Sequence, residues 1–215
     1  MLKLAPEGYP FIGVFGLLAV VVFFLFGPLY AVVPASVVLF MLWFFRDPDR
    51  TIPQEKDVFV SPADGRIIVV REVREDRYLK ADVRQVSIFM SPLNVHVNRV
   101  PCDGMVKAVR HNKGRFFAAY KDEASVRNEN IEMVLGTGYG DILLRQVAGF
   151  VARRAVCRVR EGAKVMRGER YGIIKFSSRV DIYLPKDAII KVVPDQNVKA
   201  GETVIAEYRP VSRNK

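Results

Sequence analysis

The chain has 215 residues, half of them hydrophobic, and a formal net charge of +10 at pH 7. This length suits one compact domain with an appendage and is short for two full domains. Only two cysteines, Cys102 and Cys157, and two histidines, His96 and His111, are present. Their number and spacing exclude a Cys-rich or His-rich metal site, and we expect both cysteines to be buried thiols.

The charge lies almost wholly in one part of the chain. Lys3 and Glu7 are the only charged residues before Arg46, so the residues from Arg46 onward carry the whole +10. A basic body beside a bilayer is attracted to anionic headgroups by about 1 kcal/mol per Lys or Arg near the surface. We expect an anionic membrane surface as a partner and no nucleic acid, because no nucleic-acid-binding signature occurs. The alternative is that the charge only keeps the body soluble.

An uncharged block spans 11–45 and is interrupted once. Residues 11–26 form one apolar run, Gly27-Pro28 follows, and 29–45 form a second run that contains Pro34. Neither run reaches the ~20 residues of a comfortable transmembrane helix, and Gly27-Pro28 disfavours one continuous helix. The sequence therefore predicts a membrane-anchoring helical hairpin over 1–45 and a separate domain over 46–215.

The flanks of the hairpin predict its orientation. A hairpin returns the chain to the side of the membrane on which it began, and Lys3, Arg46 and Arg50 lie at its ends. Basic flanks are typical of the cytoplasmic side, so we expect a cell-membrane protein whose body is cytoplasmic. A secretory signal peptide is the alternative, but two apolar runs occur and no small-residue cleavage site follows the first.

After residue 57, apolar residues recur at short, strand-like intervals separated by glycine and proline. These runs lie at 58–60, 66–70, 86–90, 95–100, 105–109, 142–147 and 173–176. A polar stretch at 113–130 fits either a short helix or a loop. The pattern predicts a mainly β (α+β) fold.

Two pairs of segments resemble each other within this body. Residues 62–70 read Pro-Ala-Asp-Gly before a strand, and residues 101–109 read Pro-Cys-Asp-Gly before another. Residues 159–169 and 194–202 each hold two turns around an apolar position. The second pair resembles the half-repeats of lipoyl and biotinyl barrel-sandwich domains. It predicts a β-sandwich or barrel and says nothing about function by itself.

Five segments carry a further resemblance. They are Phe-Arg-Asp-Pro at 45–48, Ser-Pro-Ala-Asp-Gly at 61–65, Asn-Val-His-Val-Asn-Arg-Val-Pro at 94–101, Gln-Val-Ala-Gly-Phe-Val-Ala-Arg-Arg at 146–154 and Gly-Ile-Ile-Lys-Phe-Ser-Ser-Arg-Val-Asp-Ile-Tyr-Leu-Pro at 172–185. In this order they resemble the phosphatidylserine decarboxylase family, in particular its short bacterial and archaeal branch. The resemblance extends from Arg46 to about Tyr208, which is nearly the whole body.

The resemblance implies a proenzyme that cuts its own backbone between Ser177 and Ser178 and converts Ser178 into a pyruvoyl cofactor. The two pieces, 1–177 and 178–215, then remain as subunits. It implies conversion of phosphatidylserine to phosphatidylethanolamine and carbon dioxide through a Schiff base with the pyruvoyl group, without a metal. Glycine is usual before the cut, and the side chain of Ser177 restricts the backbone there, which can slow or block cleavage. The alternative is that this branch tolerates serine, which adds only a small hydroxymethyl group. The oligomeric state, including a homo-oligomer, stays open.

The chemistry of the cut needs partners for Ser178. A serine hydroxyl attacks a carbonyl only when a base removes its proton; His96 is the natural base, and Asp64 can orient the imidazole. Once protonated, His96 can donate the proton that decarboxylation requires.

Four further residues are candidates for substrate binding. By the resemblance, Asn128 and Glu129 fall in a stretch near the substrate end of the family. Arg46 and Arg153 can meet a lipid phosphate.

Two other functions fit part of the sequence. Asp64, His96 and Ser178 also allow a membrane-anchored serine hydrolase without self-cleavage, although no G-x-S-x-G nucleophile motif is present. The turn repeats alone favour a non-enzymatic, lipoyl-like membrane adaptor. That class carries a modifiable lysine at a hairpin tip, and Lys80-Ala81 is the nearest match without the neighbour expected beside it. Both alternatives predict an intact chain.

Overall fold

The computed structural model describes residues 3–114, 128–149, 154–175 and 178–208. Most of the polar stretch expected at 113–130 lies outside these ranges, as do Ser177 and Arg153. The chain forms two compact units, Met1–Asp49 and Arg50–Lys215, and each is described on its own.

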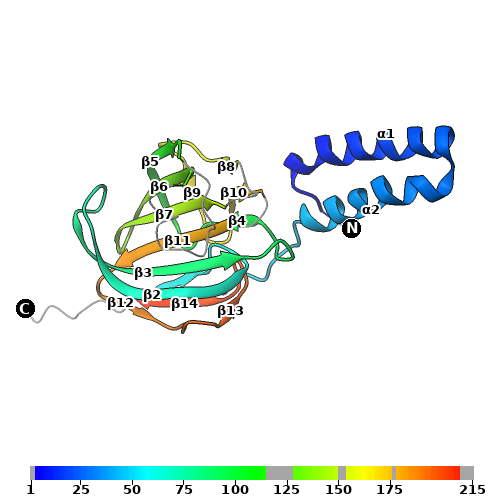
Figure 1. The fold of residues 1–215 in the computed structure, drawn as a ribbon. Helices are drawn as coiled ribbons and strands as arrows, with labels where there is room; N and C mark the ends of the chain where they lie inside the picture. Colours follow the sequence, from blue (N-terminus) through cyan, green and yellow to red (C-terminus); the bar gives the residue numbers. More distant parts are fainter. Residues whose placement is uncertain (1–2, 115–127, 150–153, 176–177, 209–215) are drawn as a thin grey trace, which may run out of the picture. The chain divides into compact units, whose positions relative to one another are not determined.

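Two apolar helices form a hairpin in the N-terminal unit (Figure 1). A short 3-10 helix, η1 (Pro6–Gly8), leads into α1 (Tyr9–Phe26), and α2 (Pro28–Phe44) follows after one residue. That residue, Gly27, has a φ of 89°, a conformation that glycine adopts without strain. Pro28 then opens α2 at a position where a helix needs no N–H donor. The predicted helical hairpin is confirmed.

The hairpin exposes its apolar side chains, and no residue of α1 is buried. Among the described residues, one helical stretch, Pro6–Phe26, is long and apolar enough to cross a membrane, and the apolar Pro28–Phe44 is shorter. Apolar surface left in water costs about 25 cal/mol per Å². The unit is therefore consistent with membrane association.

Contacts between the two ends of the hairpin close it. The backbone N–H of Ala5 donates to the Phe45 carbonyl at 2.8 Å, and the rings of Phe11 and Phe45 stack with centroids 5.6 Å apart. Gly8 lies beneath the same ring, because a Cβ at this position would be 2.6 Å from Phe45 Cγ. Residues 5 and 45 therefore lie side by side, so the chain enters and leaves the hairpin at the same end.

The body is built from β-strands. They are β1 (Val58–Val60), β2 (Gly65–Glu75), β3 (Ala81–Met90), β4 (Val97–Arg99), β5 (Gly104–Asn112), β6 (Asn130–Thr137), β7 (Gly140–Ala148), β8 (Ala155–Cys157), β9 (Lys164–Val165), β10 (Arg170–Ile174), β11 (Ser178–Pro185), β12 (Ala188–Ile190), β13 (Asn197–Val198) and β14 (Val204–Tyr208). The predicted mainly β fold with a preceding helical hairpin is confirmed.

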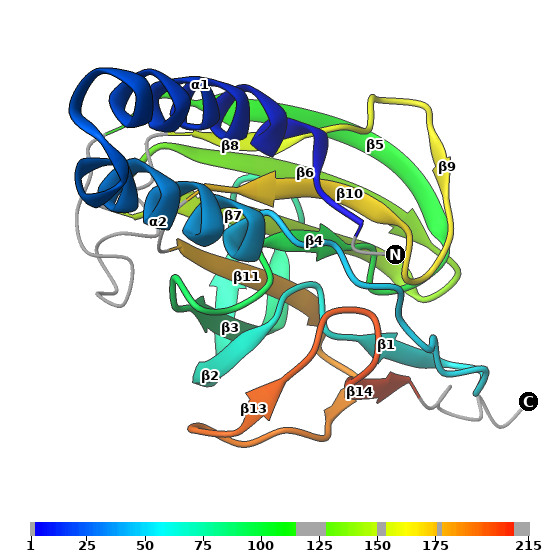
Figure 2. The same ribbon diagram turned by 90° about the vertical axis from the view of Figure 1, so that its right-hand side faces the viewer.

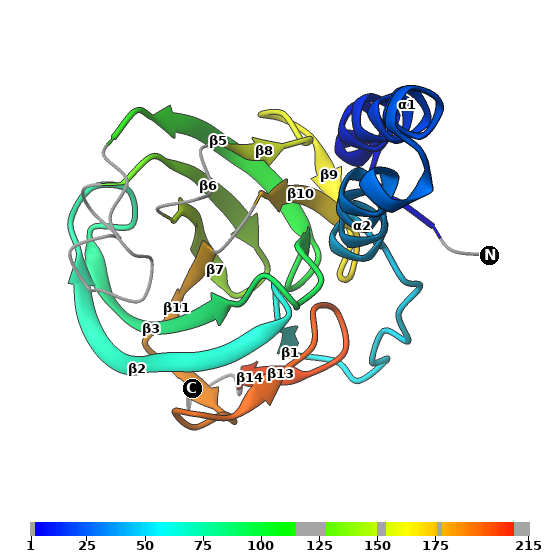
Figure 3. The same cartoon turned by 45° about the vertical axis from the view of Figure 1, so that its right-hand side comes forward.

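One large sheet dominates the body. Its strand order is β13-β2-β3-β11-β7-β6-β5-β9, with antiparallel neighbours throughout. Figure 3 shows this sheet curling into a half-barrel, with β11 between β3 and β7. Two three-stranded sheets, β1-β14-β12 and β4-β10-β8, complete the body, and Figure 2 shows β1 beside β14. The predicted sandwich or barrel class agrees with this arrangement.

The central strands of the large sheet are buried on both faces. Side chains alternate along each strand, so Val180, Ile182 and Leu184 of β11 lie in the apolar core while Arg179 and Asp181 take the opposite face. That opposite face is also withdrawn from solvent, although it is polar. Its buried polar members include Gln85, Ser87, Glu132, Arg179 and Asp181.

The strand order repeats on the two sides of the large sheet. The half β13-β2-β3-β11 matches the half β9-β5-β6-β7, and the sheet β1-β14-β12 matches β4-β10-β8. The first pair of similar segments, 62–70 and 101–109, leads into β2 and β5. The second pair, 159–169 and 194–202, contains β9 and β13. The resemblance between the segments therefore reflects equivalent places in the fold.

The two halves of the sheet also share individual hydrogen bonds. Asp64 precedes β2 and accepts the backbone N–H of Ala200 at 2.7 Å. Asp103 precedes β5 and accepts the backbone N–H of Arg167, also at 2.7 Å. Each carboxylate thus ties the turn before one strand to the turn after β9 or β13, as turn aspartates commonly do.

The two cysteines differ in burial. Cys102 is buried, as predicted, whereas Cys157 is only half-buried, and both are free thiols. Burial raises the pKa of Cys102 to about 12, so this side chain stays a neutral thiol at physiological pH.

Candidate active site

Ser178 is the first residue of β11 and lies in the middle of the large sheet. It is fully buried and pairs with Met90 of β3 on one side and Ala148 of β7 on the other. Its hydroxyl donates to the thioether sulfur of Met90 at 3.4 Å. A thioether is a weak acceptor, so the hydroxyl is held without a strong competing hydrogen bond.

A buried amide pair lies next to this contact. The side chain of Asn98 in β4 donates to the same Met90 sulfur at 3.7 Å, and Gln146 of β7 donates to Asn98 Oδ1 at 2.8 Å. Gly172 allows this packing, because a Cβ there would clash with the Val156 carbonyl and lie 2.8 Å from Gln146 Nε2. Ser178 therefore faces a small polar cluster within the core.

Sequence reasoning missed Met90, Asn98 and Gln146 as site residues. One signal was available for Asn98, which follows His96 by two residues and so lies on the same face of an extended segment. No comparable signal pointed to Met90, because an apolar residue at a strand end is usually a core residue.

His96 is fully buried just before β4. Its backbone carbonyl accepts the N–H of Ile174, the last residue of β10, at 3.4 Å. Its ring Nδ1 lies 3.0 Å from the Asn94 carbonyl. Because a carbonyl can only accept, Nδ1 carries the proton, and the lone pair of the neutral ring is at Nε2. The ring is therefore oriented and in a tautomer that can act as a base.

Asp64 has different partners. Its two carboxylate oxygens lie 2.8 and 3.0 Å from the same guanidinium nitrogen of Arg50, and Ala200 completes its hydrogen bonding at 2.7 Å. The side chains of Arg50 and Asp64 are only 7% and 12% exposed, and Glu202 lies 3.4 Å from Arg50. The orienting bond to His96 Nδ1, expected from Asp64, comes here from Asn94.

The sheet register places Asp64 and Ser178 on the two sides of β3. Arg66 of β2 pairs with Phe89, and Ser178 of β11 pairs with Met90, so the starts of β2 and β11 flank the end of β3. Gly65 lies so close to β3 that a Cβ would clash with the Phe89 carbonyl. The close approach explains why glycine follows Asp64.

Of the four candidate substrate residues, two are in the body, one is in the N-terminal unit and one is outside the described residues. Asn128 and Glu129 lie beside Ala148, the neighbour of Ser178, and the Glu129 carboxylate lies 3.0 Å from His111. Arg46 belongs to the N-terminal unit, where its guanidinium donates to the Trp43 carbonyl at 2.7 Å and stacks over the indole. Arg153 lies outside the described residues, as does Ser177 of the expected cleavage site.

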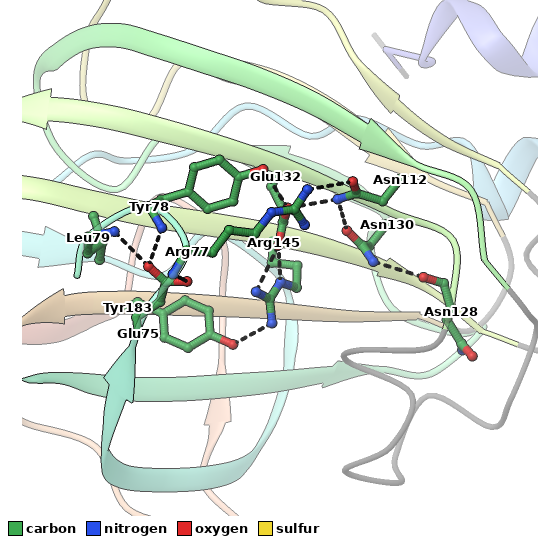
Figure 4. Close-up of polar contacts among 10 residues, drawn as sticks. All are labelled: Glu75, Arg77, Tyr78, Leu79, Asn112, Asn128, Asn130, Glu132, Arg145 and Tyr183. Carbon is green, nitrogen blue, oxygen red and sulfur yellow. Dashed lines mark hydrogen bonds and ion pairs between the residues drawn. The ribbon is translucent and has the colours of Figure 1, made fainter. Parts of the chain in front are cut away.

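A hydrogen-bonded network extends across the polar face from Asn128 (Figure 4). Its centre is the buried carboxylate of Glu132, which contacts Arg145 at 2.8 Å, Arg77 at 3.0 Å and the Tyr78 hydroxyl at 2.9 Å. Burial, and then the hydrogen bond to Glu132, raise the pKa of Tyr78. Tyr78 therefore stays protonated and donates to Glu132 at physiological pH.

The ion pair of Asp64 gives a stability prediction with an internal control. Asp64→Asn keeps the oxygen that accepts the Ala200 N–H but removes the negative charge beside Arg50. We expect it to lower the free energy of unfolding by about 1–3 kcal/mol, because it leaves the buried Arg50 guanidinium with only the longer contact to Glu202. Asp103→Asn keeps the equivalent turn bond, and among the described residues its exposed side chain forms no ion pair. This variant should change the free energy of unfolding by less than about 0.5 kcal/mol. Urea unfolding of both variants measures this, and equal effects would contradict it.

Known proteins resemble this chain over most of its length. The model of the phosphatidylserine decarboxylase family matches residues 37–206. A phosphatidylserine decarboxylase proenzyme of Syntrophus aciditrophicus is 44% identical over 207 residues, which cover 95% of this chain and 97% of that protein. A proenzyme of the same name from Aromatoleum aromaticum is 45% identical over 205 residues, 95% of each chain. Asp64, His96 and Ser178 all lie within the matched residues. The chain belongs to the phosphatidylserine decarboxylase family of enzymes.

Proposed function

We propose that this chain converts phosphatidylserine to phosphatidylethanolamine and carbon dioxide with a pyruvoyl group that it makes from Ser178. The position of Ser178 carries the proposal. A buried serine at the first position of a central strand becomes, after a cut on its amino side, a chain end that two neighbouring strands still hold. The names of the relatives support the same activity.

Self-cleavage follows from ordinary serine chemistry. His96 takes the hydroxyl proton, Ser178 Oγ attacks the Ser177 carbonyl carbon, and the amide nitrogen takes up a proton as the peptide bond becomes an ester. Removal of the Ser178 α-proton then breaks the ester, frees 1–177 with a terminal carboxylate and leaves dehydroalanine. Water replaces the nitrogen, which leaves as ammonia, and position 178 ends as a keto acyl group.

The β7 neighbour of Ser178 fits this group. A pyruvoyl group has no backbone N–H, so a neighbouring strand that does not bond to that N–H is undisturbed when the group forms. The backbone N–H and carbonyl of Ala148 both bond toward the β6 side, to Glu129 and Asn128, and so do not need Ser178. The keto group supplies an acceptor for the electron pair released with carbon dioxide.

His96 and Asp64 have supporting parts in the proposal. His96, with its lone pair at Nε2, serves as the base of self-cleavage and afterwards as the proton donor to the product. The carboxylate of Asp64 is paired with Arg50 and accepts the Ala200 N–H, so its part is to fix the turn that leads into β2, across β3 from Ser178.

The two pieces remain one protein in this proposal. After a cut before Ser178, β11 still lies between β3 and β7, β13 pairs with β2, and β14 pairs with β1. The small piece thus contributes strands to two sheets whose other members belong to the large piece. These ladders and their buried side chains are what we expect to hold the subunits together.

We place the body at the cytoplasmic face of an anionic membrane. The segment 154–175 has seven basic and two acidic residues. In the described part of the chain its exposed Arg154, Arg160 and Lys164 form no ion pair, while basic residues elsewhere do, such as Lys107 with Asp141 at 2.7 Å. Surface cations without a protein partner attract anionic lipids. The backbone carbonyl of Arg154 accepts the N–H of Lys175, three residues before Ser178 in the sequence.

Reductive trapping tests the proposal. Incubating the purified protein with phosphatidylserine and borohydride is expected to attach the lipid to the 38-residue piece, 178–215. Mass spectrometry should find it on residue 178, with no trapping when phosphatidylcholine, which has no primary amine, replaces the substrate. Lipid attached only to residues 1–177 would contradict the proposal.

A further inference from the structure

The ladder between β6 and β7 ends next to Ser178 in an unusual way. The main-chain strand β6 begins at Asn130, yet pairing continues one step further toward Ala148. The N–H of Ala148 donates to the Glu129 carbonyl at 2.9 Å, and the side-chain amide of Asn128 donates to the Ala148 carbonyl at 2.7 Å. Asn128 thus supplies with its side chain the bond that a backbone N–H would supply in a longer strand.

The residue held in this way is the immediate neighbour of Ser178. Ala148 pairs with Ser178 across the β7–β11 ladder, and both residues are fully buried. While the chain is intact, Ser178 is also held through its covalent link to the preceding residue. Once that link is cut, the new chain end is held by its bond to Arg179 and by its neighbours in β3 and β7.

Asn128 is itself fixed by two further side-chain amides. The side chain of Asn130 donates to the Asn128 carbonyl at 2.8 Å, and Asn112 donates to Asn130 Oδ1 at 2.9 Å. Asn112 also lies 2.7 Å from the carboxylate of Glu132. Asn128 is 1% exposed and Glu132 is 3% exposed. Buried networks with satisfied members hold one arrangement, because any other arrangement leaves a polar group unpaired.

The far end of the network is anchored to the β2–β3 hairpin (Figure 4). Glu75 accepts the backbone N–H groups of Arg77, Tyr78 and Leu79, which shapes the hairpin turn. Arg77 and Tyr78 then reach Glu132 with their side chains. The position of Asn128 is therefore tied to three strands and a hairpin, not to its own segment alone.

We propose that Asn128 is a positioning residue for Ser178: through Ala148 it fixes the β7 side of the reacting serine, and the network centred on Glu132 holds it there. The inference rests on the proposed function. Its chemical basis is the amide N–H bond to Ala148, so a carboxylate of the same size cannot replace it, because an ionised oxygen would face the Ala148 carbonyl oxygen.

The test is the rate of self-cleavage in freshly made Asn128→Asp protein, followed on gels at a temperature well below its unfolding midpoint. We expect cleavage about tenfold slower or more than in wild type, because small displacements of reacting groups cost rate steeply. Asn197→Asp, the same change at an exposed position of β13, should cleave at the wild-type rate.

Two further measurements separate positioning from stability. Glu132→Gln should lower the unfolding midpoint while slowing cleavage less than Asn128→Asp, since its network retains the bond to Ala148. If Asn128→Asp does not fold, Asn128→Ser provides the test, because its short hydroxyl falls short of the Ala148 carbonyl. A folded Asn128 variant that cleaves at the wild-type rate overturns the inference, whereas a wild-type chain that never cleaves overturns the proposed function.

Discussion

Ser178→Ala is expected to leave a single full-length chain, whereas the wild-type protein separates into pieces of 177 and 38 residues. The loss should be complete, because the proposed cut needs the Ser178 oxygen as nucleophile and no other atom at this position can replace it. Denaturing gels and intact-mass measurement detect the difference directly. Because this variant is not cut, it should have no decarboxylase activity.

The fold should survive this substitution. Among the described residues the Ser178 hydroxyl makes one weak contact, to the Met90 sulfur, so its removal strands no strong partner there. The unfolding midpoint of Ser178→Ala is therefore a control, and a large decrease would make loss of cleavage uninformative. Ser177→Ala supplies the matched control, because it keeps the nucleophile and should still be cut. An active protein whose residue 178 is an unmodified serine would contradict the proposal.

The fold was largely predictable because its signals are local. Gly27-Pro28 interrupts an apolar block, and the structure has a hairpin turn there. The two Asp-Gly turns, at 64–65 and 103–104, predicted the strands β2 and β5 that follow them. Their partner turns are equally local, since Gly168 and Gly201 have φ values of 80° and 76°, which favour glycine.

The buried polar face of the large sheet was not predictable. Along β11 the sequence alternates apolar and polar residues, which is typical of a strand with one side in water. Arg179 and Asp181 are instead fully buried, and Arg179 Nε lies 2.5 Å from Asp181 Oδ1. Alternation reports which side chains share a face, but only the curvature of the whole sheet determines whether both faces are covered.

The candidate site was predictable residue by residue and not as an arrangement. Ser178 and His96 lie in recognisable motifs, and His96 lies beside β10, whose chain leads on to Ser178. The ion pair of Asp64 with Arg50 was not expected, because no sequence pattern links Arg50 to the turn at Asp64. The expectation that Asn128 lies near the substrate stays a prediction, and its amide bond to the backbone next to Ser178 was not foreseen.

His96→Ala is expected to slow self-cleavage by at least about 100-fold, the usual contribution of a positioned general base. His96 has the tautomer that a base requires, with Nδ1 held by Asn94 and the lone pair at Nε2. Its removal leaves an imidazole-sized space in the core, so added imidazole should restore part of the rate. Gels taken over hours to days measure the cleavage rate with and without imidazole.

His111 provides the comparison, as the only other histidine of the chain. It is exposed and lies 3.0 Å from Glu129, so His111→Ala should cleave at the wild-type rate and gain nothing from imidazole. His96→Gln separates base chemistry from packing, because it fills much of the space and can donate to Asn94 but cannot accept a proton. If His96→Gln were cut as fast as wild type, another group would have to take the proton from Ser178, and the pairing of these two residues would fail.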